Sequence, residues 1–521
     1  MIEARGDTRR PPARVVVVGA GVAGLAAAWE LTGASTPPVT GGASVPSVVV
    51  LEAASTVGGK LATAPFAGQP VDVGPDGFLG RRPEAVELCR ALGLGDDLAP
   101  IGLSGAAVWA RGRRRPLPEG LYLGLPTRVL PVARSGILSP LGVLRLAEDV
   151  VAPRPDRRGP LGDRAVGPLV ARKLGNQVVD RLVDPMLGGI HAGGVADASA
   201  AAVMPALLQA SQRGGSFLRS LRRLSKAAPA VPGGGAPAPA DDPAPAPAFW
   251  TLRSGPATLA DRLRQVLEAR GADVRTGCRV DALERAGQGW VLRAAGGTLA
   301  ADAVVLALPA GATAALLAPH DPDAAALLRA VDYASLAVVT MLVAEDALPS
   351  DLYGTGLLVP RASALDDLDD DGSGAGAACL VTAVTYLWAK WPHLARQGRL
   401  LLRASVGRYG DERIASLDDA QLVARVTREL ATLLDLGAPP IESLVTRWPQ
   451  ALPQYKVHHM LRVTGVEAAA KRLGNLSVAG AAYRGVGIPA CVASGRAAAR
   501  IVLEQLGRSR APGPEESPVA P

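Results

Sequence analysis

The chain has 521 residues, of which 48% are hydrophobic, so it exceeds one compact core and is expected to divide into two or three substructures. Its net charge of +7 is small for this length, and its densest basic run, residues 111–115, has no aromatic or fold signature of nucleic-acid binding. The four widely spaced cysteines form no CxxC pair, which argues against a metal site or a disulfide framework and fits a reducing cytoplasm. No apolar run is long enough to predict a membrane span or a signal peptide.

A Gly-rich turn near the N-terminus is the most informative stretch. Four valines at 15–18 predict a buried parallel strand, and an Ala/Leu helix follows the turn. Gly19 allows the tight turn, Gly21 lets phosphates approach the backbone, and Gly24 lets helix and strand pack closely. The pattern predicts a dinucleotide cradle at the helix N-terminus, with NAD and FAD both compatible.

The next strand supports this interpretation. Residues 48–52 end in Glu52, whose carboxylate would accept hydrogen bonds from the adenosine ribose hydroxyls. Gly59 and Lys60 follow in a second Gly-rich turn, which fits either a clamp on the cofactor phosphates or a solvated surface turn. The Gly/Ser/Thr/Pro-rich residues 32–47 between helix and strand are predicted to be an exposed loop.

The middle of the chain is less regular. A turn over residues 71–82 ends in Arg81 and Arg82, and a helix is expected over 83–94. Residues 98–226 are predicted to be mostly helical, and their apolar stretch 117–146 fits a core better than a lipid-facing surface, although both are compatible. Pro/Ala repeats predict a mobile linker over 227–248.

Alternating strands and helices are expected in the second half. Strands are predicted at 273–275, 280–283, 303–308, 337–343, 378–384 and 476–480, with helices at 257–270, 418–436 and from about 489 to 506. The acidic run 366–371 predicts a solvated loop, and residues 509–521 a disordered tail.

Taken together, the motifs resemble those of a known family. They occur in order across nearly the whole chain, at residues 19–24 with Glu52, 58–60, 74–78, 453–455 and 485–491. The chain resembles the FAD-dependent porphyrinogen oxidases of haem synthesis, the protoporphyrinogen or coproporphyrinogen III oxidase family, within the amine-oxidase-like flavoproteins. Two departures from the family pattern are Ala490, where an Asp is usual, and His458, where a Gly is common.

The resemblance implies an α/β fold with a Rossmann-like FAD-binding domain assembled from non-contiguous segments. That domain would comprise residues 1–80, 249–312 and 445–508. A mixed α+β substrate domain would comprise 81–110, 190–226 and 313–444, and a helical insertion over 111–189 lets some family members associate with a membrane.

The resemblance also implies which residues bind the non-covalent FAD. The adenosine and pyrophosphate would be held by Gly19, Gly21, Gly24, Glu52, Gly59 and Lys60. Gly74 belongs to the cofactor-binding set, Val280 would lie by the adenine or simply in a strand core, and Gly480, Val486 and Ile488 would lie near the ribityl chain and flavin. No metal site is expected.

The implied reaction removes six electrons and six protons from a porphyrinogen, with oxygen as acceptor and peroxide released. The pyrrole nitrogen lone pair stabilises the developing cation, so a strong protein base is not required and no catalytic residue is assigned. Because buried substrate carboxylates need cations, Arg81 and Arg82 are substrate-binding candidates, with surface charges as the alternative. His191, in the Gly-rich turn 188–194, is a third candidate, with a structural role as its alternative.

Coproporphyrinogen III is the favoured substrate and protoporphyrinogen IX the first alternative. An amine or polyene oxidase is a weaker alternative because 3% aromatic residues offer little material for an amine cage. A flavin-containing porphyrin carrier is the non-enzymatic alternative. The expected location is cytoplasmic, with peripheral contact at the inner face of the membrane and transient contact with the next haem-synthesis enzyme left open.

Overall fold

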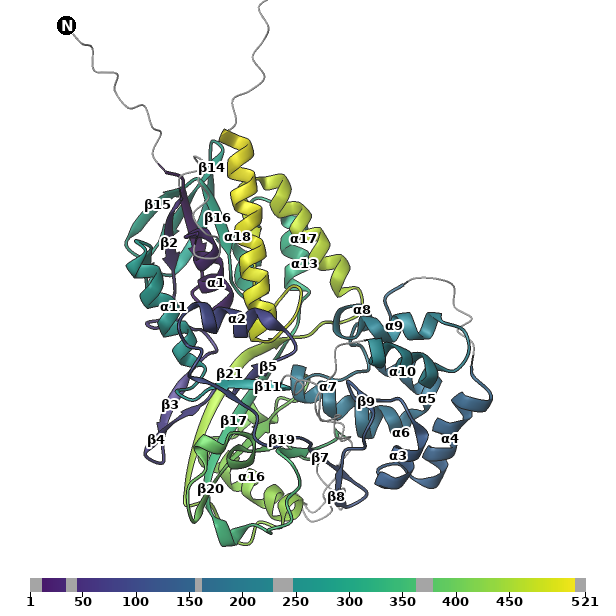
Figure 1. The fold of residues 1–521 in the computed structure, drawn as a ribbon. Coiled ribbons are helices and arrows are strands. Elements are labelled where there is room, and N and C mark those ends of the chain that lie inside the picture. Colours follow the sequence, from purple (N-terminus) through teal and green to yellow (C-terminus); the bar gives the residue numbers. More distant parts are fainter. Residues whose placement is uncertain (1–11, 34–44, 155–161, 228–246, 362–377, 511–521) are drawn as a thin grey trace, which may run out of the picture. The chain divides into compact units, whose positions relative to one another are not determined.

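The computed structural model describes residues 12–33, 45–154, 162–227, 247–361 and 378–510 (Figure 1). Most of the predicted 32–47 loop and of the 227–248 linker, the acidic run 366–371 and the tail from 511 lie outside these residues. The chain divides into two units, each built from separate stretches of sequence. Unit 1 comprises Met1–Leu61, Ala257–Ala330 and Arg462–Pro521, and unit 2 comprises Ala62–Pro256 and Val331–Leu461.

Unit 1 is organised around a five-stranded parallel sheet in the order β12-β2-β1-β16-β22. Its strands are β1 (Arg14–Val18), β2 (Ser47–Leu51), β12 (Asp273–Arg275), β16 (Ala303–Leu306) and β22 (Leu476–Val478). The apolar residues of β1 and β16 are buried, as expected for parallel strands covered on both faces. The predicted strands at 15–18, 48–52, 273–275, 303–308 and 476–480 are therefore confirmed, with small differences at their ends.

Helices and a small sheet complete unit 1. The helices are α1 (Val22–Leu31), α11 (Ala257–Ala269), α12 (Ala310–Leu317), α13 (Pro322–Arg329), α17 (His459–Leu473) and α18 (Ile488–Arg510), and the small antiparallel sheet contains β13 (Val280–Ala286), β14 (Gly289–Ala294) and β15 (Gly297–Ala301). α18 runs along α1, and its Gly495 permits this because a β-carbon there would lie 2.0 Å from the carbonyl oxygen of Ala23. The disordered tail is predicted from residue 509, but α18 continues to Arg510.

An ion-pair cluster also joins α1 to α18. The buried Glu30 carboxylate of α1 accepts hydrogen bonds from Arg496 at 2.9 Å and from Arg500 at 2.7 Å. The first and last helices of unit 1 are thus held together by close backbone packing and by paired charges.

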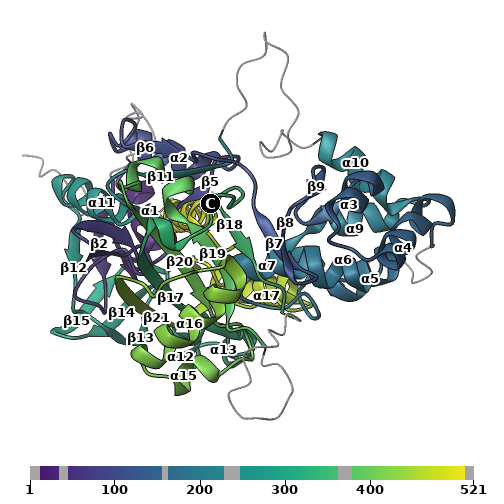
Figure 2. The same ribbon diagram turned by 90° about the horizontal axis from the view of Figure 1, so that it is seen from below.

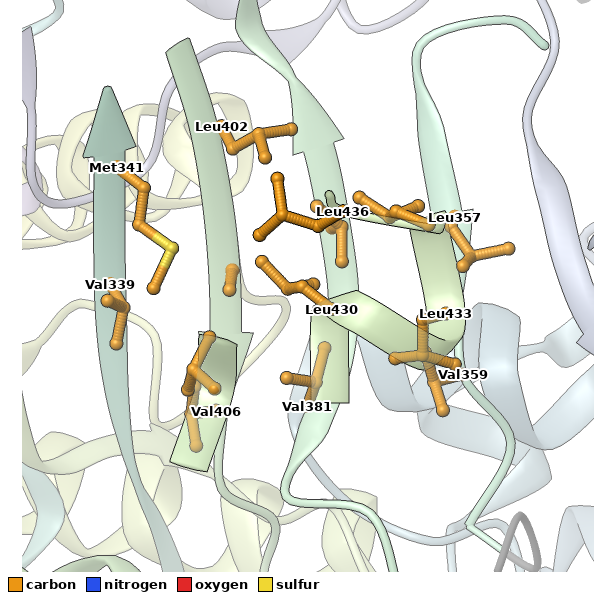
Figure 3. Close-up of a cluster of buried hydrophobic side chains, with 14 of the residues drawn as sticks. Val339, Met341, Leu357, Val359, Val381, Leu402, Val406, Leu430, Leu433 and Leu436 are labelled. Carbon is orange, nitrogen blue, oxygen red and sulfur yellow. The ribbon is translucent and has the colours of Figure 1, made fainter. Parts of the chain in front are cut away.

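Unit 2 contains a seven-stranded mixed sheet in the order β21-β17-β20-β19-β18-β7-β8. Its strands are β21 (Glu442–Pro453), β17 (Tyr333–Ala344), β20 (Arg399–Val406), β19 (Val381–Tyr386), β18 (Gly356–Leu358), β7 (Ala107–Ala110) and β8 (Arg113–Pro116). Helix α16 (Asp419–Leu434), which begins with a capping box at Asp418 and Gln421, packs Leu430 and Leu433 against the sheet (Figure 3).

Short strands and helices flank this sheet. They are β3 (Thr63–Phe66), β4 (Gln69–Asp72), β5 (Phe78–Leu79), β6 (Leu98–Pro100), β11 (Phe249–Leu252), α2 (Pro83–Ala91), α14 (Leu387–Lys390) and α15 (Arg413–Ser416). The division into units therefore differs from the predicted segments. Residues 62–80 and 249–256 belong to unit 2, since β5 and β6 both pair with β11, and 445–461 belong there because β21 pairs with β17. Residues 313–330 belong to unit 1.

The predicted helical region of unit 2 is a group of short helices that lie together in both views (Figures 1 and 2). They are α3 (Val129–Ser135), α4 (Pro140–Val151), α5 (Val166–Leu174), α6 (Asn176–Val178), α7 (Asp184–His191), α8 (Ala200–Val203), α9 (Pro205–Gln212) and α10 (Phe217–Ala227), and the hairpin β9 (Leu121–Tyr122) and β10 (Leu125–Pro126) precedes them.

Part of the apolar stretch 117–146 is buried in this region, and part of it is exposed. Leu125, Val132 and Leu146 belong to its core, whereas Leu141 and Leu144 of α4 are 76% and 66% exposed. The expectation of a core is therefore correct for only part of the stretch. Within the described ranges, every helix falls short of the length and apolar character needed to cross a membrane.

Candidate cofactor and substrate sites

The Gly-rich turn between β1 and α1 has the geometry that the sequence predicts. Gly19 has φ +100°, and a β-carbon there would lie 2.5 Å from the carbonyl oxygen of Ala307. At Gly24, a β-carbon would lie 1.8 Å from the carbonyl oxygen of Gly19. Both positions therefore exclude any side chain, which lets α1 start close to the end of β1.

Gly21 has a different environment. No atom lies within 4 Å of the place a β-carbon would occupy, and α1 begins after Gly21 without a side-chain cap. The second Gly-rich turn lies beside it, since Gly58 forms a parallel bridge with Gly21 and a β-carbon on Gly59 would lie 3.4 Å from the Gly21 α-carbon. Uncapped helix amides beside open space form a cradle for a pyrophosphate, so these residues fit the FAD that the sequence predicts.

Glu52 follows β2 at the same end of the sheet. Its carboxylate accepts hydrogen bonds from the backbone N–H groups of Ala20 at 2.7 Å and Ala54 at 2.8 Å. Because each carboxylate oxygen has two lone pairs, Glu52 can still accept hydrogen bonds from ribose hydroxyls. Cys278 N–H donates to the Glu52 carbonyl at 2.7 Å, which places the start of β13, including half-buried Val280, near this acid.

The C-terminal candidates lie at the carboxyl end of β22 and the start of α18. Gly480 has φ +118° with open space at the β-carbon position, and its N–H donates to Ser494 Oγ at 3.0 Å. Val486 precedes Ile488, the first residue of α18. Burial lowers the pKa of Lys60, and interaction with Cys491, in the first turn of α18, opposes this shift. Unit 1 therefore contains every predicted cofactor residue except Gly74.

Gly74 belongs to unit 2, where its carbonyl oxygen accepts a hydrogen bond from the buried Arg403. The same guanidinium donates to the Asp72 carbonyl at 3.3 Å. Asp76 forms an ion pair with Lys390 at 2.8 Å and accepts a hydrogen bond from Trp391 Nε1 at 3.2 Å. The predicted 74–78 turn is thus held by cations and a ring that lie more than 300 residues later.

The two carboxyl groups of this turn have opposite pKa shifts. Burial, and then the charge of Asp76, raises the pKa of Asp72 to about 7. Burial also opposes ionisation of Asp76, but the charges of Lys390 and Arg403 outweigh it and hold the pKa of Asp76 below its usual range. Asp76 is therefore an ionised member of the network, whereas Asp72 changes charge near neutral pH.

The three predicted substrate-binding residues do not form one cluster in the described structure. Arg81 is exposed, and Arg82 precedes α2 and pairs with Glu84 at 2.8 Å. In the described part of unit 2, no hydrogen bond or ion pair connects either arginine to His191. That histidine ends α7, and its carbonyl oxygen accepts a hydrogen bond from Gln454 Nε2 at 2.8 Å.

Three further basic residues were not predicted from the sequence. Arg403 could have been suspected, because it is a charge that directly follows the apolar run 400–402 within β20. Arg361 and Arg408 lie in loops without a local motif, so their position near the turn after α7 is visible only in the fold. No group of three or more His, Cys, Asp or Glu residues in the described ranges could hold a metal ion.

Comparison with known proteins agrees with the cradle. The chain belongs to the flavin-containing amine oxidoreductase family, which matches residues 22–503. It is an FAD-dependent oxidoreductase with the amine-oxidase-like flavoprotein fold.

Within this class, the chain is similar over nearly its whole length to porphyrinogen oxidases. It is 31% identical to the coproporphyrinogen III oxidase of Bacillus subtilis over 94% of this chain and 98% of the relative. It is 35% identical to that of Mycobacterium tuberculosis H37Rv over 95% and 98%, and 29% identical to bovine protoporphyrinogen oxidase over 94% and 98%. A crystal structure of a candidate protoporphyrinogen oxidase from Exiguobacterium sp. 255-15 superimposes with a TM-score of 0.78 at 29% identity, covering 95% of this chain and 100% of that chain.

Proposed function

We propose that this chain oxidises coproporphyrinogen III to coproporphyrin III in haem biosynthesis. The observation that carries the proposal is its near full-length similarity to coproporphyrinogen III oxidases. The reaction removes six hydrogen atoms from the porphyrinogen and reduces three oxygen molecules to three molecules of hydrogen peroxide. Unit 1 would hold the FAD, and the chemistry supplied by bound FAD would be acceptance of hydride from a methylene-bridge carbon and transfer of the electrons to oxygen.

The residues of unit 1 hold and orient the cofactor in this proposal. Gly19 and Gly24 keep α1 close to the sheet, so that its free N–H groups face the pyrophosphate next to Gly21 and Gly59. Lys60 adds a positive charge at the second turn, and Glu52 accepts hydrogen bonds from the adenosine ribose. Val280 would lie by the adenine at the same end as Glu52, and Gly480, Val486 and Ile488 would contact the ribityl chain and flavin at the other end.

The substrate carries four carboxylates, and unit 2 supplies cations that can pair with them. Arg81 and Arg82 follow the 74–78 turn. Arg403 and Lys390 hold this turn, which begins at Gly74, in place. His191 is kept neutral because burial lowers its pKa to about 4, so at neutral pH it acts as a hydrogen-bonding group rather than a cation. We infer that these residues position the substrate, while the pyrrole nitrogen itself stabilises the developing positive charge.

The test is direct. The purified protein should show the visible absorption of bound flavin and, with coproporphyrinogen III in air, should produce porphyrin fluorescence and about three peroxides per porphyrin. Gly21→Leu is the matched control, because it fills the open space of the cradle and should remove flavin and turnover together. A colourless protein that takes up no FAD, or a flavoprotein inert with both porphyrinogens, would overturn the proposal.

Protoporphyrinogen IX is the second candidate substrate, supported by the similarity to the bovine enzyme. The kcat/KM values for the two porphyrinogens, measured on the same preparation, separate the candidates. Anaerobic mixing tests the carrier alternative, since bleaching of the flavin by porphyrinogen requires electron transfer. Tight porphyrin binding without bleaching would favour a carrier, and flavin reduction by amines alone would favour an amine oxidase.

We infer a cytoplasmic location with peripheral contact at the inner face of the cell membrane. The four cysteines are unpaired and buried, which supports a reducing compartment. On α4, Leu141, Leu144 and Val151 are 66–83% exposed, and the neighbouring helix α10 carries exposed Arg219 and Arg222. Exposed apolar side chains beside arginines suit an anionic bilayer surface. The same surface could receive the next haem-synthesis enzyme, to which the product passes in transient contact.

A further inference from the structure

A small cavity in unit 2 borders the turn that follows α7. Its lining includes His191, Gly193, Gly194, Gln454 and Tyr455. The turn is tightly packed at Gly193, where a β-carbon would lie 2.0 Å from Gln454 Oε1, whereas a β-carbon on Gly194 would lie in ordinary contact, 3.4 Å from Nη2 of the exposed Arg361. The Arg361 guanidinium therefore lies against the backbone of a residue that lines the cavity.

A second guanidinium lies near Arg361. Arg408 is 7% exposed and donates a hydrogen bond to the Val359 carbonyl at 2.6 Å. The next residue, Tyr409, donates its N–H to the Ala192 carbonyl at 2.6 Å, which joins this loop to the turn after α7. Burial, and then the like charge of Arg361, lowers the pKa of Arg408. The loops that carry Arg361 and Arg408 thus both contact the turn after α7.

The charges of Asp184 and Asp411 partly oppose the shift in the pKa of Arg408, but in the described structure neither carboxylate forms an ion pair with Arg361 or Arg408. Asp184 accepts a hydrogen bond from Val195 N–H at 3.0 Å, and Asp411 forms an ion pair with Arg413 at 2.6 Å. Among the described residues, no ion pair engages Arg361. Lys456 and Asp197 also line the cavity, and Lys456 is paired with Asp332 at 2.6 Å and with Asp197 at 3.6 Å, so it adds no free positive charge. The Arg361 side therefore has an excess of positive charge that an anion could balance.

His191 supplies a directional donor to the same cavity. Its Nδ1 atom is inaccessible to solvent and has no hydrogen-bond partner in the described structure. A proton on Nδ1 would be a buried, unsatisfied donor, so the favoured tautomer of the neutral ring carries its proton on Nε2. The Nε2–H group can then donate to an acceptor in the cavity.

We propose that His191 and Arg361 bind one carboxylate side chain of the substrate, with the charge of Arg408 behind them. A carboxylate matches a neutral N–H donor and a planar guanidinium, because its two oxygens accept from both at once. The inference rests on the proposed function, in which the substrate carries four carboxylates. It places a positioning site at the turn after α7, formed by two side chains that are 170 positions apart in the sequence.

Two variants test the site against a matched control. Arg361→Gln removes the charge, and His191→Phe removes the donor while keeping a ring of similar size. Each should raise the KM for coproporphyrinogen III about tenfold and weaken coproporphyrin III binding, measured by fluorescence quenching, by a similar factor. We expect kcat and bound flavin to change less than twofold. Arg399→Gln, an exposed arginine at the start of β20, should leave all four values unchanged, and Arg361→Lys should recover part of the binding.

The outcomes separate the two proposals. If the wild-type flavoprotein turns over neither porphyrinogen, the proposed function fails. If the wild type is active but both variants keep its KM and its affinity for coproporphyrin III, the carboxylate site is wrong. If Arg361→Gln does not fold, His191→Phe and Arg361→Lys decide the question by the same two measurements.

Discussion

The candidate sites of the two units differ in the groups that form them, which are mainly backbone groups in unit 1 and side chains in unit 2. In unit 1 the site is made of backbone, since Gly19, Gly21 and Gly24 leave helix amides beside open space and exclude side chains where elements pack. In unit 2 the site is made of side chains, such as Arg403 and Lys390, that reach a turn from distant elements. A backbone site tolerates no added atoms at its packed positions, whereas a side-chain site depends on charge balance and therefore on pH.

The largest expected effect tests the backbone character of unit 1. Gly24→Ala places a β-carbon 1.8 Å from the Gly19 carbonyl oxygen, so α1 must move away from β1. We expect a loss of more than about 3 kcal/mol in unfolding free energy and loss of bound flavin, measured by urea titration and visible absorption.

Gly21→Ala is the matched control for this change, because its β-carbon meets open space. It should keep its stability within about 1 kcal/mol and weaken only FAD binding. Equal stability of the two variants would show that close packing at Gly24 is not required.

A second variant tests whether unit 1 depends on backbone alone. Glu30→Gln removes the buried charge that pairs with Arg496 and Arg500 at the contact between α1 and α18. Because both arginines keep some solvent access, we expect a loss of about 2 kcal/mol in the unfolding free energy. Arg264→Gln, which removes an exposed ion pair with Glu268, should cost less than about 0.5 kcal/mol by the same urea titration. An equal cost for both would mean that the buried cluster adds nothing.

The third prediction concerns pH and unit 2. The folded pKa of Asp72, about 7, lies above its ordinary value of 3.8, so the folded state favours the protonated acid. This contribution to stability is complete below about pH 4 and is lost as the pH rises to 7. Asp72→Asn should therefore be more stable than the wild type by about 1 kcal/mol at pH 8, with a smaller gain at pH 5, as measured by thermal unfolding.

Asp76→Asn, four residues later, should have the opposite effect. The pKa of Asp76 is held low by Lys390 and Arg403, so its stabilising charge is present at neutral pH and is lost only in strong acid. Removing that charge should lower stability at pH 8 by leaving Lys390 unpaired. If the two variants shift stability in the same direction at pH 8, the described charge balance of the turn is wrong.

The smallest expected effect lies on the helical part of unit 2. Leu141→Gln combined with Leu144→Gln changes two exposed side chains, so unfolding free energy should change by less than about 0.5 kcal/mol. Co-sedimentation with anionic phospholipid vesicles should nevertheless fall several-fold relative to the wild type. Unchanged co-sedimentation would remove the support that these leucines give to peripheral membrane contact.

The same contrast explains how much could be predicted from the sequence. The cradle of unit 1 was predictable because strand, turn and helix follow one another within residues 15–30, and each glycine has a local reason. The contacts of Arg403 with Asp72 and Gly74 were not, because they join residues more than 320 positions apart through the register of a mixed sheet. The unit boundaries differ from the predicted segments for a similar reason, since residues 445–453 carry no local sign that they pair with β17.

The interleaving of the two units also affects how the protein is made. The parallel sheet of unit 1 receives its edge strand β22, and α1 its partner α18, from residues after 475. Because the ribosome delivers the chain from its N-terminus, α1 must wait for almost the whole polypeptide before α18 covers its apolar surface. A nascent chain that stops before β22 would therefore expose this surface of α1 to chaperones and proteases, and C-terminal truncations that remove α18 should prevent cofactor uptake.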